Sequence, residues 1–165
     1  MKLPGRLEFL WISALIIILD QISKQIALDQ LPMHRPVSVI PGLDWYLTFN
    51  PGAAFSFLAD AGGWQRWFFT ITTIIISTVI LVWISRLQKN ETISAISLCL
   101  IFGGAIGNLI DRVNYGYVID FVQVWLGSYP WPAFNIADAA ISIGAVVLLL
   151  TSFRQEQKDQ DGIEK

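Results

Sequence analysis

Ionisable and amide side chains lie inside or at the ends of long apolar stretches of this 165-residue chain. These residues are Asp20, Lys24, Asn108, Asp111, Arg112, Asn135 and Asp138. Because ionisable groups are costly at membrane depth, their presence there indicates a functional site. Asp20 and Lys24 are spaced i,i+4 and therefore share one face of a helix. Asn135 and Asp138, spaced i,i+3, share another. We expect these faces to converge on one site, together with Asp120 from a neighbouring loop.

The chemistry open to this set is limited by the residue types that it lacks. The single histidine, His34, lies in a proline-flanked loop and no HExxH motif is present, which disfavours Ser-His, Cys-His and zinc-peptidase chemistry. A Ser-Lys dyad that uses Lys24 is conceivable, but Asp20 one helical turn away makes this amine a poor base. Two carboxylates remain, and a close pair of Asp groups shares one proton, so that one activates water while the other donates to the substrate carbonyl. The residues therefore predict aspartyl peptidase chemistry.

The composition is that of a membrane protein. Apolar residues make up 54% of the chain and charged residues 15%, which excludes a disordered chain and disfavours a soluble domain. Eleven Lys and Arg against thirteen Asp and Glu leave no basic excess, so nucleic acid is not an expected partner. The single cysteine, Cys99, forms neither an internal disulfide nor a CxxC metal site. We expect no metal and no cofactor, because the polar cluster offers Asp and Asn oxygens without His or Cys.

Four apolar stretches are long enough to cross about 30 Å of hydrocarbon as helices. We expect a single membrane-embedded domain over 1–165, with spans at about 8–28, 66–86, 92–111 and 133–153, extracytoplasmic loops at 29–65 and 112–132, and a cytoplasmic tail at 154–165. Small residues at i,i+4, namely Gly103 with Gly107 and Ala140 with Gly144, favour close packing of the third and fourth spans. The fold class predicted is an all-α integral membrane protein of four transmembrane helices, with a small extracytoplasmic β-sheet and an interfacial loop.

The distribution of Lys and Arg predicts the orientation. Most of them precede the first span, lie between the second and third, or follow the fourth. The other side holds only Arg35, Arg66 and Arg112, with Lys24 at the end of the first span. Both termini are therefore predicted to be cytoplasmic. The first span resembles a signal peptide, but it lacks a small-residue cleavage site, and we interpret it as an uncleaved anchor.

The outward loops carry strand and turn signals. Residues 37–40 and 45–49 predict two short strands around Pro41-Gly42, and 118–124 is a second β-prone run. Residues 50–52 predict a turn that leads into the apolar segment 53–58. We therefore expect a small sheet on the membrane surface, with an aromatic belt at 125–132 and a frayed polar tail at 155–165.

Five ordered blocks resemble the lipoprotein signal peptidases, also called signal peptidase II. The blocks are DQISK at 20–24, NPGAAFS at 50–56, GGAIGNLIDR at 103–112, VIDF at 118–121 and FNIAD at 134–138. The resemblance implies an intramembrane aspartyl endopeptidase of the bacterial cytoplasmic membrane that uses no metal. Such an enzyme removes the signal peptide of prolipoproteins just before a diacylglyceryl-modified cysteine. By the motif match, Asp120 and Asp138 are the catalytic pair, near the extracytoplasmic face. Prolipoprotein and membrane lipids are the implied partners, and we expect a monomer.

The supporting residues each have a structural interpretation beside the functional one. Asp20 and Lys24 form either a buried intrahelical ion pair or part of the site. Asp111 and Arg112 form either an interfacial pair at the end of the third span or support for the site. Asn50 forms an Asx turn or contacts substrate.

Asn108 and Asn135 are expected to orient backbone or carboxylate groups. A transporter with intramembrane carboxylates and a non-catalytic assembly factor are the competing functions. A transporter is disfavoured because the polar residues occupy only the outer half of the spans.

Overall fold

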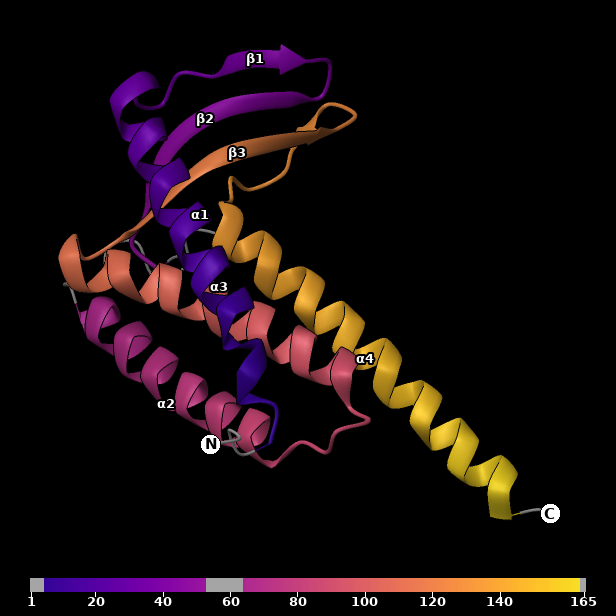
Figure 1. Cartoon of the computed structure of the whole chain (residues 1–165). Coiled ribbons are helices and arrows are strands. Elements are labelled where there is room, and N and C mark those ends of the chain that lie inside the picture. Colours follow the sequence, from indigo (N-terminus) through magenta and orange to yellow (C-terminus); the bar gives the residue numbers. More distant parts are fainter. Residues whose placement is uncertain (1–4, 53–63, 164–165) are drawn as a thin grey trace.

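Four long apolar helices dominate the computed structural model, which describes residues 5–52 and 64–163 (Figure 1). They are α1 (Leu10–Gln30), which follows a short 3-10 turn, η1 (Leu7–Phe9), then α2 (Trp64–Arg86), α3 (Thr92–Asn114) and α4 (Ile136–Ile163). All four are long and apolar enough to cross a membrane, so the predicted helical class is confirmed. The segment 53–58, including the end of the NPGAAFS block, lies outside the described residues.

The outer faces of these helices are apolar. Large apolar side chains are exposed on all four helices, for example Trp67 at 61%, Ile75 at 58% and Ile143 at 57%. Helices that expose such residues face hydrocarbon and not water. α3 is the central helix, because it packs against α1, α2 and α4 and contributes more buried residues than any other element that the structure describes.

Glycines allow α3 and α4 to approach their neighbours closely. A Cβ atom added at Gly103 would lie 2.9 Å from the Ser13 backbone of α1, and one at Gly144 would lie 2.6 Å from the Ser97 carbonyl oxygen of α3. Neither position has room for a larger residue. The small-residue spacing seen in the sequence therefore does bring the helix backbones together.

An antiparallel sheet lies at one end of the helices, whereas η1 and the end of α4 lie at the opposite end (Figure 1). Its strands are β1 (Val37–Ile40), β2 (Leu43–Asn50), β3 (Val118–Leu126) and β4 (Tyr129–Pro130), in the order β1-β2-β3-β4. β3 thus joins the two predicted outward loops in one sheet. β2 carries a bulge between Trp45 and Thr48, and Thr48 is the partner of Asp120 on β3. Bulges of this kind are common beside functional side chains.

α4 begins and ends at residues different from those expected. It begins at Ile136 and not near Ala133, because Phe134 is still paired with Val122 of β3 and Asn135 lies just before the first helical residue. The backbone stays helical to Ile163, so the tail is not frayed over the part that the structure describes. Glu, Gln and Lys are good helix formers, which accounts for this extension.

Candidate active site

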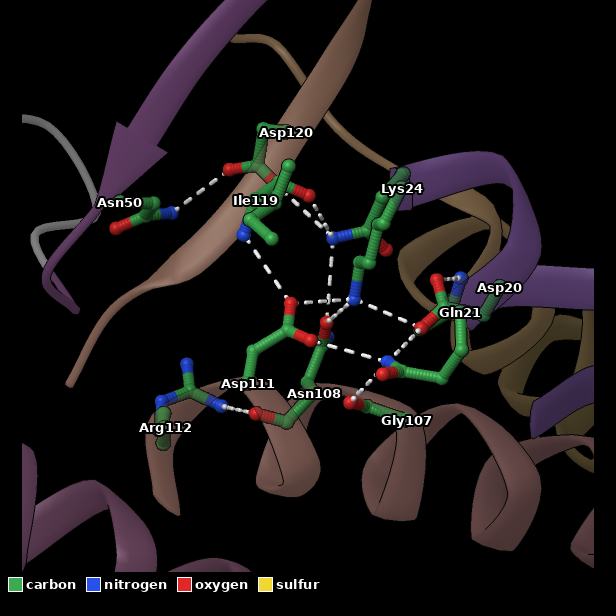
Figure 2. Close-up of polar contacts among 12 residues, drawn as sticks. Asp20, Gln21, Lys24, Asn50, Gly107, Asn108, Asp111, Arg112, Ile119 and Asp120 are labelled. Carbon is green, nitrogen blue, oxygen red and sulfur yellow. Dashed lines mark hydrogen bonds and ion pairs between the residues drawn. The ribbon is translucent and has the colours of Figure 1, made fainter. Parts of the chain in front are cut away.

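Lys24 is the centre of a buried polar network between α1 and α3 (Figure 2). Its Nζ lies 2.8 Å from Asp20 Oδ2 and 2.8 Å from Asp111 Oδ2, and it donates to Asn108 Oδ1 at 3.0 Å. The Lys24 side chain is only 2% exposed. All three ammonium donors therefore have partners, and the amine has no free lone pair with which to act as a base. The ion pair expected from the i,i+4 spacing is present, extended by a second carboxylate.

Asp111 turns towards α1 and the sheet. Its Oδ1 accepts from Gln21 Nε2 at 3.0 Å, and its Oδ2 accepts from the backbone N–H of Ile119 at 3.1 Å. The interpretation of Asp111 and Arg112 as an interfacial ion pair is therefore wrong, because Lys24 is the cation beside Asp111. Arg112 instead lies over the Phe69 ring at 5.4 Å, and its Nη1 donates to the Asn108 carbonyl oxygen at 3.5 Å.

Two asparagines connect this network to Asp120 and Asp138. Asn108 Nδ2 donates to Asp138 Oδ1 at 2.8 Å, and Asn135 Nδ2 donates to Asp120 Oδ1 at 2.7 Å. Asn135 Nδ2 also lies 3.2 Å from Asn108 Oδ1, which links the two amides. Each carboxylate thus accepts from one of these two asparagines, and the link between the amides fixes the two carboxylates relative to each other.

The first turn of α4 fixes Asp138 in place. Asn135 Oδ1 accepts from the Asp138 backbone N–H at 2.9 Å, and Asp138 Oδ2 accepts from the Asn135 N–H at 3.3 Å. This reciprocal arrangement has the form of a capping box, with Asn at the N-cap and Asp three residues later. Asp20 Oδ1 accepts from the next free amide, Ala137 N–H, at 2.9 Å. Asp20 therefore binds two partners: Lys24 through Oδ2, and the start of α4 through Oδ1.

Asn50 forms the predicted Asx turn and also contacts Asp120, whereas its contact with substrate stays a prediction. Its Oδ1 accepts from the Gly52 N–H at 2.9 Å, which is the Asx turn, and Gly52 has a positive φ of 106°. Its Nδ2 points towards Asp120 Oδ2 at 3.2 Å, from the end of β2 (Figure 2). The turn thus aims the Asn50 amide at the carboxylate.

Asp120 is a buried carboxyl with an altered affinity for protons. It is 2% exposed. Burial, and secondly the charge of Asp138, raise the pKa of Asp120 from 3.8 to about 7, although hydrogen bonds from Asn50 and Asn135 oppose this change. A carboxyl of this kind holds a proton near neutral pH, and its neighbour Asp138 lies half-buried at the edge of the cluster. Such a pair has the means for general acid and general base chemistry.

Sequence reasoning missed Gln21 and the Ala137 amide. Gln21 Nε2 reaches Asp111 Oδ1, Asp20 Oδ2 at 3.2 Å and the Gly107 carbonyl oxygen at 3.2 Å, so it crosslinks α1 and α3. Its position beside Asp20 inside an apolar span was a usable signal. The Ala137 amide had none, because its role depends on where α4 begins. Among the residues singled out from the sequence, Lys24, Asn50, Asn108 and Asn135 each donate to a carboxylate, whereas Arg112 donates to none in the described part of the chain.

Comparison with known proteins shows which family the chain resembles. The family described as "Signal peptidase (SPase) II" matches residues 12–154. The lipoprotein signal peptidase of Pseudomonas paraeruginosa is 49% identical over 158 residues, which covers 94% of each chain. That of Xanthomonas axonopodis pv. citri is 49% identical over 161 residues, or 96% of this chain and 94% of the relative.

Solved structures share the fold. One, described as a bacterial membrane enzyme, superposes with a TM-score of 0.81 at 29% identity and covers 96% of this chain and 95% of its own. A second, described in the same words, gives a TM-score of 0.77 at 29% identity over 92% and 97% of the two chains.

Proposed function

Because the chain belongs to the signal peptidase II family, we propose that it removes the signal peptide from bacterial prolipoproteins by cleaving before the diacylglyceryl-modified cysteine. It is a multi-pass protein of the inner membrane and an aspartic-type endopeptidase. In this proposal Asp120 and Asp138 are the catalytic pair. The observation that carries the assignment is that these two carboxyls share one amide-linked cluster in which Asp120 is buried with a raised pKa.

In the proposed reaction, Asp138 acts as the base and Asp120 as the acid. The Asp138 carboxylate takes a proton from water, and the water oxygen bonds to the scissile carbonyl carbon. Asp120 gives its proton to the carbonyl oxygen, which forms a neutral tetrahedral diol. The carbon–nitrogen bond then breaks as Asp138 returns its proton to the leaving amine and Asp120 recovers one from the diol. Both carboxyls thus return to their starting states.

The other polar residues position this pair. Asn108 and Asn135 hold the two carboxylates, and Lys24 holds Asn108 through its amide oxygen. Asn50 donates to Oδ2 of Asp120, whereas Asn135 donates to Oδ1. In this proposal the Asn50 amide donates instead to the carbonyl oxygen of a bound substrate. Asp20 and Asp111 neutralise Lys24 and thereby permit its burial.

The proposal places both termini in the cytoplasm and the site near the extracytoplasmic face, in one domain that acts as a monomer. Two observations support this orientation: the Lys and Arg distribution, and the position of η1 and the end of α4 opposite the sheet. Labelling of cysteines introduced at Ser38 and Gln160 tests it. An impermeant reagent added to cells is expected to label S38C and not Q160C. Equal labelling would overturn the orientation.

Cleavage of a lipidated prolipoprotein in detergent tests the function. Asp120→Asn and Asp138→Asn are each expected to abolish cleavage, and the double variant to be scarcely worse, because the two groups act as one unit. Asp44→Asn is the matched control, since Asp44 is a buried Asp of the same sheet that accepts from Trp125 Nε1 at 2.8 Å outside the network. Asparagine retains that acceptor, so this variant should cleave normally. Near-normal turnover by either Asp120 or Asp138 variant would refute the pair, and ion flux without cleavage in proteoliposomes would favour a transporter.

A further inference from the structure

A pocket of about 380 Å³ lies between the first turns of α4 and the segment 131–134. Its α4 wall consists of Asp138, Ala139, Ser142 and Ile143. We propose that this pocket holds an acyl chain of the substrate's diacylglyceryl group, and that Ala139 and Ser142 leave the room for it. The inference rests on the proposed function and specifies where its lipid binds.

The lining and position of the pocket suit hydrocarbon. Apart from Asp138 at one end and the Ser142 hydroxyl, the side chains around it are apolar or aromatic. The wall residue Ile143 is 57% exposed, and Val146 and Leu150, one and two turns further along α4, are 56% and 57% exposed on the side of the helix that faces lipid. The pocket is therefore continuous with the membrane interior, and an acyl chain enters it without crossing water.

The pocket suits an acyl chain better than a peptide. An α-helix is about 10–12 Å wide with its side chains, so a helical signal peptide does not fit in this volume. An extended peptide needs free backbone groups with which to pair. Most of the lining backbone has no free N–H to offer: Trp131 and Phe134 donate to the Val124 and Val122 carbonyl oxygens, Pro132 has no N–H, and Ala139 donates to the Asn135 carbonyl oxygen. Hydrocarbon needs no such partners.

Substrate chemistry selects this pocket over a second apolar one. The lipid is attached to the side chain of the cysteine whose nitrogen leaves, so its chains begin within a few bonds of the scissile bond. The second pocket, about 370 Å³, lies between α1 and the sheet and includes Ser23, Ala27, Trp45 and Phe121 but neither Asp120 nor Asp138. Of these two pockets, the α4 pocket is the one that borders a member of the proposed pair.

A Ser→Leu substitution in each pocket tests the assignment. Ser142→Leu fills the α4 pocket, and Ser142 is exposed to the lipid side, where leucine is well tolerated. Ser23→Leu is the matched control, since Ser23 lies on a helix and lines the other pocket. Wild type and both variants are assayed in the same micelles with two lipopeptides that differ only in their acyl chains, palmitoyl or butanoyl.

For S142L we expect KM for the palmitoyl substrate to rise at least about tenfold, the cost of overfilling an apolar pocket. Cleavage of the butanoyl substrate should stay within about twofold of wild type, which shows that the variant is folded and that its catalytic pair is intact. S23L should cleave both substrates normally. Equal effects of S142L on both substrates, no effect on either, or a chain-length effect in S23L instead would each overturn the assignment. Failure of the wild type to cleave either substrate would refute the proposed function itself.

Discussion

Replacing Asp120 by asparagine should change the pH dependence of stability as well as activity. Burial raises the pKa of Asp120 from 3.8 to about 7. The folded protein therefore holds this proton more tightly than the unfolded chain, and the free energy of unfolding falls as pH rises from about 4 to about 7. The pKa difference corresponds to about 4 kcal/mol, fully present below this window and lost above it.

Asparagine cannot ionise and so avoids this loss. It has one acceptor oxygen where the carboxylate has two, so the Asn50 or the Asn135 amide loses its partner, at a cost of about 1–2 kcal/mol. We therefore expect D120N to be slightly less stable than wild type near about pH 4 and more stable by about 2–3 kcal/mol near about pH 8.

Thermal unfolding in detergent across this pH range, followed by tryptophan fluorescence, measures the difference. Thr48→Val is the control, because Thr48 is the uncharged partner of Asp120 in the β2–β3 register. Its difference from wild type should not vary with pH. A D120N difference that is constant with pH, or that favours wild type more at alkaline pH, would refute the reasoning about burial.

Two further predictions concern the same network. Cleavage should follow a bell in pH whose alkaline limb lies at about 7, because ionisation of Asp120 removes the proton that the pair shares; undiminished activity well above that pH would contradict the shared proton. Lys24→Met should lower the free energy of unfolding by about 3–5 kcal/mol, because it leaves the Asp20 and Asp111 carboxylates buried without their cation. Detergent unfolding compares it with Lys89→Met, a change of a lysine outside the network, and equal stability of the two variants would show that the ion pairs contribute nothing.

The sequence predicted features that depend on local pattern. Apolar length predicted the four helices, the Pro41-Gly42 turn predicted the β1–β2 hairpin, and the i,i+4 spacing predicted the Asp20–Lys24 pair. Each of these follows from residues close together in the chain. The block resemblance added the assignment of Asp120, which no local pattern separates from other loop carboxylates.

Features that depend on tertiary contacts were not predictable. Asp111 has Arg112 beside it in sequence, yet it pairs with Lys24, because the choice depends on how α3 faces α1. α4 begins at Ile136, later than predicted, because Phe134 still pairs with Val122 of the sheet. Asn50 reaches Asp120 only through the pairing of β2 with β3, two strands far apart along the chain.

The hydrogen bond from Ala137 to Asp20 has a consequence for biogenesis. The two residues are separated by 117 positions, so α1 enters the bilayer during synthesis long before the start of α4 exists. At that stage Asp20 and Lys24 neutralise each other within one helical turn, which lowers the cost of inserting both. Asp111, Asn108 and finally the first turn of α4 join them as translation proceeds. The last helix to be made supplies Asp138, so a nascent chain does not bring Asp120 and Asp138 together until its final span is in place.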